Sequence, residues 1–290
     1  MQSIKNTFRN YTISELLHIF DHKFGLGRLE LALASNWINP LKTIWLNFRS
    51  FPLCQAWKLP IWVYGRPRLY CLTGSMKVGG SVSSGMIKFN KDKHAGPSLT
   101  SAQSVICNYG TIIFRGKGLI GTGTKIVVYH KCTLDLGKNF KITDFCNIGC
   151  LKGITIGEQC RIAHRCQILD SNYHYVANFT KRNVKRHGAP IHLGKGCWIC
   201  NSSTITGGSQ LPDFTIVASN SLVNKDFSNI EYSSLIGGIP AKYIATGFRK
   251  IENSKIEKEI NDFFSNSQKE EFPLDETISR DLYSYVDIFK

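Results

Sequence analysis

The spacing of aliphatic residues is the strongest signal in the chain. From residue 193 onward every sixth position is aliphatic, and a small residue stands four places after most of them. An amphipathic helix repeats about every 3.6 residues and a strand every two, so neither element produces this pattern. A six-residue period is typical of a hexapeptide β-helix, in which each short strand forms one face of a coil. The aliphatic positions are Leu193, Ile199, Ile205, Leu211, Val217 and Val223.

The same period occurs upstream of residue 170 and becomes blurred before about residue 130. Cysteines often occupy its small position, where a small buried side chain belongs, so we expect them to be packing residues. Cys197 and Cys200 also have the spacing of a redox pair or half a zinc site, but no second pair completes a four-sulfur site. The upstream aliphatic positions are Leu136, Ile142, Ile148, Ile156, Ile162 and Ile168, and the cysteines at small positions are Cys146, Cys160, Cys166 and Cys197.

These repeats resemble those of the hexapeptide-repeat acyltransferases over about residues 136–247. The resemblance implies a mainly β protein, a left-handed parallel β-helix, which we expect over residues 69–250. The left hand is implied by the family alone, because connections between parallel strands are otherwise right-handed.

The N-terminal region, residues 1–68, lacks the six-residue period. A capping box at Thr12 predicts one helix, and Asn39 followed by proline predicts another over residues 41–48. We expect the region to be a helical cap on the open end of the solenoid, which such repeats need. The alternative is peripheral contact with an anionic membrane surface, because four of the five tryptophans lie here among basic residues.

Composition excludes several classes of protein. With 290 residues, 42% of them hydrophobic and 20% charged, the chain is neither disordered nor a small disulfide scaffold. No apolar run approaches the roughly 18 residues of a membrane span, and the N-terminal residues lack the apolar stretch of a secretory signal. We therefore expect a cytoplasmic protein, with the inner face of the membrane as a second location.

The net charge of +15 is unevenly distributed. Residues 251–290, whose apolar spacing predicts a C-terminal helix followed by an acidic tail, hold ten acids and five bases. They carry a net −5, so residues 1–250 carry +20. Such a charge favours a polyanionic partner, which is nucleic acid, an anionic membrane surface or a phosphate-rich cofactor. Charge alone does not choose among these.

The six-residue period stops over residues 170–192, which predicts a loop extruded from one corner of the coil. Transfer of an acyl group from a thioester to a hydroxyl needs a base of near-neutral pKa, which a histidine on this loop supplies. Residues Asp170 to His174 resemble the element that bears the catalytic histidine in sugar O-acetyltransferases of this family. The resemblance implies that His174 is the base and that Asp170 or Asn172 fixes its tautomer.

Two alternatives concern His187. It stands in a run that faintly resembles the histidine-bearing element of serine acetyltransferases, which makes it a competitor for the role of base. His187 and His192 also invite comparison with the zinc histidines of the carbonic-anhydrase branch, although His192 lies outside the matching context. We expect no metal.

The donor side of the site is implied by further resemblances. Four segments resemble the elements that hold coenzyme A in the family. They are residues 190–200, where the β-helix resumes after the loop, residues 205–208 with their glycine pair, residues 217–221, and Lys225 with residues 238–242. Two departures stand out, because Cys200 and Asn220 occupy positions where the family has glycine. The residues expected to bind acetyl-CoA are Trp198, Gly208, Ala218, Ser219, Lys225, Pro240, Ala241 and Lys242.

The resemblance therefore implies a coenzyme-A-dependent O-acetyltransferase. The expected acceptor is a hydroxyl of a capsular or exopolysaccharide sugar precursor, attacked directly without an acyl-enzyme. A homotrimer is implied, and no nucleic acid partner is expected. Two alternatives remain: N-acylation of a nucleotide-linked amino sugar, and a non-catalytic scaffold that binds acidic polymers.

Overall fold

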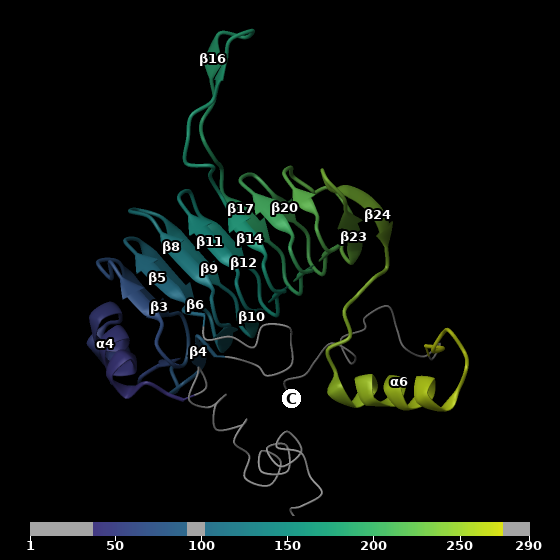
Figure 1. Cartoon of the computed structure of the whole chain (residues 1–290), viewed down its shortest axis with the longest axis horizontal. Helices are drawn as coiled ribbons and strands as arrows, with labels where there is room; N and C mark the ends of the chain where they lie inside the picture. The colour runs from purple at the N-terminus through teal and green to yellow at the C-terminus, as the bar shows by residue number, and fades with distance from the viewer. Residues whose placement is uncertain (1–36, 92–101, 275–290) are drawn as a thin grey trace, which may run out of the picture.

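The computed structural model describes residues 37–91 and 102–274, and it contains three sheets of parallel strands around one core (Figure 1). Apart from a hairpin in the extruded loop and the last two strands, successive strands enter the three sheets in turn, so each strand pairs with its equivalent one coil away. The parallel β-helix expected from the repeat is confirmed, and its left hand is the one that the family resemblance implied.

Sheet 1 has nine strands, sheet 2 has seven and sheet 3 has six. Sheet 1 consists of β1 Ile61–Val63, β4 Ile87–Phe89, β7 Gly118–Ile120, β10 Phe140–Ile142, β13 Arg161–Ile162, β18 Trp198–Ile199, β21 Ile216–Val217, β23 Ser234–Gly237 and the antiparallel β24 Lys242–Thr246. Sheet 2 consists of β2 Arg68–Tyr70, β5 Val105–Asn108, β8 Lys125–Val128, β11 Asn147–Cys150, β14 Gln167–Leu169, β19 Thr204–Thr206 and β22 Leu222–Val223. Sheet 3 consists of β3 Ser75–Val78, β6 Thr111–Phe114, β9 Thr133–Leu136, β12 Ile154–Ile156, β17 Ile191–Leu193 and β20 Gln210–Leu211.

The aliphatic positions of the repeat form the core of the solenoid. In sheet 1, Ile142 pairs in register with Ile162, which pairs with Ile199. Each of these side chains is at most 1% exposed, so apolar area is removed from water in every coil. The aliphatic positions expected in the other two sheets are buried as well, for example Ile205 and Leu211.

The solenoid begins earlier than the six-residue period indicates. Strand β1 starts at Ile61, within the residues 1–68 assigned to the N-terminal cap. Large side chains replace aliphatic ones in the early coils, which blurs the pattern. Phe140 breaks the repeat yet is 2% exposed, and its ring occupies the space where a side chain on Gly118 would lie.

Glycines follow the aliphatic residue at the corner between sheets 3 and 1 because the next coil passes too close for a side chain. A Cβ atom on Gly137 would lie 2.3 Å from the backbone of residue 158, and one on Gly157 would lie 2.5 Å from the backbone of Gly194. Such contacts cannot be relieved by rotating a side chain, since both neighbours are main-chain atoms.

We predict that Gly157→Ala lowers the free energy of unfolding by about 1–3 kcal/mol, the usual cost of overpacking. Chemical denaturation measures it. Gly80→Ala is the matched control, because the nearest atom to its added Cβ is 3.9 Å away. Equal stability of the Gly157 and Gly80 variants would contradict the close stacking of coils.

The expected helix near residue 41 is confirmed as α4 Pro40–Ser50, with Asn39 as its N-cap, and it is followed by the short α5 Leu53–Ala56. Figure 1 shows α4 at the N-terminal end of the solenoid, where Phe51 stacks on Phe114 at 6.3 Å. The helix predicted from Thr12 lies outside the described residues.

The C-terminal helix is confirmed as α6 Ser254–Asn266, which has no buried residue, and the last part of the acidic tail lies beyond the described residues. The segment 248–253 connects the solenoid to this helix along sheet 1, where Glu252 pairs with Arg161. Within the described ranges, no helix combines the length and apolarity needed to cross a membrane.

Candidate active site

The extruded loop leaves the coil at the corner between sheets 2 and 3. The chain departs after β14 and returns at β17, and between them β15 Ala177–Asn178 and β16 Asn183–Val184 form an antiparallel hairpin. Figure 1 shows this hairpin projecting far from the body of the solenoid. Its side chains are strongly exposed, with Phe179 at 89%.

Asp170 anchors the start of the loop. Its carboxylate is fully buried and accepts hydrogen bonds from the backbone N–H groups of Leu151, Lys152 and Gly153 at 2.7–3.0 Å. The resemblance implied that either this residue or Asn172 fixes the tautomer of His174, and the Asp170 oxygens instead accept hydrogen bonds from the turn of the preceding coil. Asp170 therefore holds two successive coils together at the base of the loop.

The next residues are also fixed. The Ser171 hydroxyl accepts a hydrogen bond from the Tyr173 N–H at 3.0 Å, and the Tyr173 ring lies 5.6 Å from that of Tyr129. Burial raises the pKa of the Tyr173 hydroxyl to about 12. His174 follows directly, so its backbone starts from a constrained position while its ring remains exposed. Asn172 is exposed too.

His187 closes the base of the loop. The Ser171 hydroxyl lies 2.9 Å from His187 Nδ1 and donates to the His187 carbonyl oxygen at 2.8 Å. When the hydroxyl gives its one proton to that carbonyl, Nδ1–H is the donor in the contact with Ser171. Tyr175 packs edge-on against the His187 ring, with the ring centroids 4.4 Å apart. His187 is thus the better oriented histidine of the two.

Gly208 and Lys225, two of the residues expected to bind the donor, lie at the corner between sheets 2 and 3. Gly208 donates through its N–H to the carbonyl oxygens of Ala189 and Pro190, both at 3.2 Å, at the point where the loop returns. Its φ is +86°, and a Cβ there would meet only the Ala189 side chain, at 3.7 Å. Lys225 follows β22 at the same corner one coil later, exposed, with its ammonium 4.8 Å from the Phe227 ring.

Another group gathers at the neighbouring corner, between sheets 1 and 2. The Ser219 hydroxyl donates to Asn201 at 3.1 Å, beside Ala218. Asn220 has a φ of +56°, a left-handed conformation that asparagine tolerates better than most residues, so the departure from glycine keeps the turn. Pro240, Ala241 and Lys242 are the last residues expected to bind the donor. Ala241 is attached to this corner, because its N–H donates to the Leu222 carbonyl oxygen at 2.7 Å. Its neighbours Pro240 and Lys242 are exposed.

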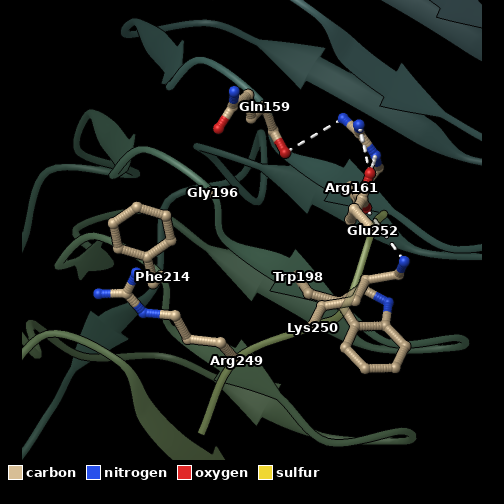
Figure 2. A pocket seen from close by; sticks show the side chains of 8 residues that line it. All are labelled: Gln159, Arg161, Gly196, Trp198, Phe214, Arg249, Lys250 and Glu252. Carbon is tan, nitrogen blue, oxygen red and sulfur yellow. Dashed lines mark hydrogen bonds and ion pairs between the residues drawn. The ribbon is translucent and has the colours of Figure 1, made fainter. Parts of the chain in front are cut away.

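Trp198 is not brought together with either group. It lies on the outer face of sheet 1 among residues of the C-terminal segment, with the Lys250 ammonium 5.6 Å from its ring (Figure 2). Trp198 lines a cavity of about 10 Å³, which is room for about one water molecule, and a larger pocket of about 260 Å³ on the outer face of sheet 1. This side chain is a packing contact in the described structure.

The metal alternative gains no support from the geometry. In residues 37–91 and 102–274, no three histidine, cysteine or acidic side chains lie close enough together to hold a metal ion. His192 is exposed on β17, where it pairs in register with Thr155.

Comparison with known proteins places the chain among its relatives. No known family profile matches the sequence. Over 166 residues it is 30% identical to the "Uncharacterized 24.8 kDa protein in cps region" of Klebsiella pneumoniae, covering 54% of this chain and 72% of that protein. The chain belongs to the same family as this cps-region protein.

The fold of this chain superposes only partly on solved structures. The polySia-specific acetyltransferase NeuO is 17% identical with a TM-score of 0.41, covering 69% of this chain and 93% of its own. The polysialic acid O-acetyltransferase OatWY is 18% identical with a TM-score of 0.38, covering 68% and 99%. Likenesses at this level carry no argument about activity.

Sequence patterns missed the residues that organise the loop in this member of the cps-region family. Ser171 and Tyr173 lie within the run that resembles the histidine-bearing element, but their own roles depend on contacts with His187 and Tyr129. A serine two residues after the last strand before the interruption, followed by a histidine later in the same interruption, is a signal that would have marked the Ser171–His187 pair.

Proposed function

We propose that the chain is a coenzyme-A-dependent acyltransferase that acetylates a hydroxyl of a capsular or exopolysaccharide sugar precursor. The carrying observation is the fixed segment from Asp170 to Tyr173, which leads directly to the exposed His174 at the corner between sheets 2 and 3. The resemblance of this segment to the histidine-bearing element of sugar O-acetyltransferases supports the same assignment. Acetyl-CoA is the donor in this proposal, and no metal takes part.

In the proposed reaction His174 takes the proton of the acceptor hydroxyl as its oxygen forms a bond to the thioester carbonyl carbon. The bond from that carbon to sulfur then breaks, and the coenzyme A thiolate receives the proton from His174. Acceptor and donor are bound together, so the products are an acetyl ester and free coenzyme A. Asp170 and His187 act as positioning residues, because their contacts hold the base of the loop.

Direct transfer also fits the chemistry of the cysteines. Burial raises the pKa of the Cys166 thiol to about 11 and raises that of Cys200 as well. A thiol kept protonated at neutral pH is a poor nucleophile, so neither residue is suited to carry the acyl group. Cys146, Cys160 and Cys197 are buried free thiols that pack in the core, as the repeat predicted.

In this proposal the donor binds along the corner between sheets 2 and 3. Gly208 leaves open space beside the base of the loop, which suits a narrow pantetheine arm. Lys225, one coil further on, supplies a positive charge for a phosphate. The residues at the neighbouring corner, Ala218 to Lys242, offer a second position for the nucleotide end.

We predict that Lys225→Ala raises the Michaelis constant for acetyl-CoA by about two- to fivefold, because an exposed lysine–phosphate contact is worth little more. The contact is remote from the reacting carbon, so kcat stays close to that of the parent. Binding of coenzyme A weakens more than binding of its dephospho form, and the difference shrinks at high salt. Titration calorimetry with both ligands measures it.

Lys242→Ala is the matched variant at the neighbouring corner. A selective loss in Lys242→Ala alone would move the nucleotide end to that corner. If both variants bind the two forms of coenzyme A as the parent does, the phosphate assignment is wrong.

Incubation with acetyl-CoA and a panel of sugar acceptors tests the function itself. The proposal expects release of free coenzyme A that depends on the acceptor, and a product that hydroxylamine cleaves, as it does an ester. A hydroxylamine-resistant product would show the N-acyl alternative. No turnover with any acceptor and no coenzyme A binding would leave the scaffold alternative.

The assembly and location remain proposals. The resemblance implies a homotrimer, and the exposed hairpin is suited to contact a neighbouring copy. Light scattering of the purified chain measures the mass of the assembly. The cytoplasmic location, with the inner face of the membrane as the second position, is measured by cell fractionation; Trp45 and Trp57, at 60% and 74% exposed, are available for such a surface.

A further inference from the structure

The outer face of sheet 1 carries a row of side chains that the proposed reaction does not use. In β1, β4 and β10 the first and last side chains are buried in the core, so the central one points outward. The register of neighbouring strands aligns these outward residues across the sheet. In order they are Trp62, Lys88, Leu119, Lys141, Arg161 and Trp198.

A groove of about 650 Å³ runs along the first part of this row. Four cationic side chains line it, and Glu252 at its far end is the only acidic lining residue in the part of the chain described. Serine and asparagine side chains from two coil corners add hydroxyl and amide groups. The cations are Lys88, Lys117, Lys141 and Arg161, and the polar residues are Ser83, Ser84 and Asn139.

The row already binds a carboxylate of the chain itself. Arg161 donates to Glu252 through Nε at 2.8 Å and pairs with it through Nη2 at 2.5 Å, and the Lys250 ammonium lies 3.1 Å from the other oxygen (Figure 2). The side chains of Arg161 and Glu252 are only 11% and 9% exposed. This pair shows which group the face accepts, and it neutralises the last cation of the row.

Among the residues that the structure describes, Lys88, Lys117 and Lys141 form no ion pair with an acidic side chain. Lys141 is next to Arg161 in register, and Lys88 lies two strands beyond Lys141, about 10 Å at the usual strand spacing. These positive charges follow a line across the strands, so they match charges repeated along an extended chain better than a single compact anion. Phe140 is the only aromatic residue that lines the groove in the described part of the chain, and it is buried, so the groove itself offers bases no exposed ring; the half-buried rings of Trp62 and Trp198 stand at the two ends of the row.

We propose that this groove binds an extended acidic glycan through its carboxylates, with Lys88, Lys117 and Lys141 as the cationic contacts. Sheet 1 is the side of the coil opposite the corner that bears His174, because that corner joins sheets 2 and 3. The site is therefore distinct from the proposed reaction centre, and its occupancy does not depend on catalysis.

The test measures binding of a fluorescent oligogalacturonate to the full chain by polarisation. We expect the double variant Lys88→Gln/Lys141→Gln to weaken binding by about five- to tenfold, since two exposed charge contacts are lost. Its salt dependence is expected to become shallower, because fewer charges pair with the polymer. Both residues face outward, so the melting temperature is expected to match that of the parent, and it is measured on the same samples.

Lys125→Gln, on the outer face of sheet 2, removes one charge elsewhere and is the control. The expected result is parental affinity in this control and no binding of a neutral malto-oligosaccharide. Unchanged affinity in the double variant would overturn the proposal, as would an equal loss in Lys125→Gln. Single-stranded DNA that binds as tightly and is lost equally in the double variant would overturn the preference for carboxylates. None of these outcomes depends on acetyl transfer, so this proposal and the proposed function can fail separately.

Discussion

His174→Ala is expected to lower kcat for acetyl transfer by about 10²–10⁴-fold, the usual contribution of a general base. The affinity for coenzyme A is expected to stay close to that of the parent, because the ring is exposed on the loop and supports no buried contact. Steady-state kinetics and coenzyme A titration on the same preparation separate the two effects.

His187→Ala is the matched variant on the same loop. Its loss is expected to be smaller, through the missing contact with Ser171 and the looser base of the loop. If His187→Ala abolishes turnover while His174→Ala is mild, the oriented ring of His187 is the base and the assignment of His174 is wrong.

Asp170→Ala has the second large effect, and it acts on stability as well as on turnover. The substitution leaves three backbone N–H groups of the preceding turn without their acceptor. We expect the free energy of unfolding to fall by about 2–4 kcal/mol, since an unsatisfied donor in a buried site costs about 1–3 kcal/mol. Turnover falls with it, because Asp170 fixes the segment that ends at His174. Chemical denaturation and kinetics measure both.

Asp170→Asn is expected to lose less stability, because its amide keeps one acceptor oxygen. Asp135→Ala is the surface control, since the ion pair of Asp135 with the half-exposed Arg115 is worth at most about 1 kcal/mol. If Asp170→Ala is as stable as Asp135→Ala, the carboxylate does not anchor the loop.

The repeat made the solenoid predictable from the sequence because each coil imposes the same physical demand. An aliphatic side chain such as Ile162 must fill the same space in every coil, and a residue such as Gly157 must leave room for the next one. The early coils were harder to predict, since Phe89 and Phe114 fill that space with larger side chains and longer corner segments shift the spacing.

Only the parts of the site that are local in the sequence could be predicted. The loop and its two histidines interrupt a regular pattern, so the sequence located them. The partners of Asp170 lie one coil earlier, and the pairing of Arg161 with Glu252 joins residues 91 positions apart. Contacts of that kind depend on how coils stack and on where the C-terminal segment returns, and no local pattern encodes either.

Equilibrium binding of coenzyme A to the purified chain tests the central claim most directly. An acyltransferase that uses this donor is expected to bind it saturably, in competition with acetyl-CoA, and to retain that binding in His174→Ala. Saturable binding that survives loss of the base is the result that the account predicts. No binding at any attainable concentration of coenzyme A would contradict it, whatever the fold.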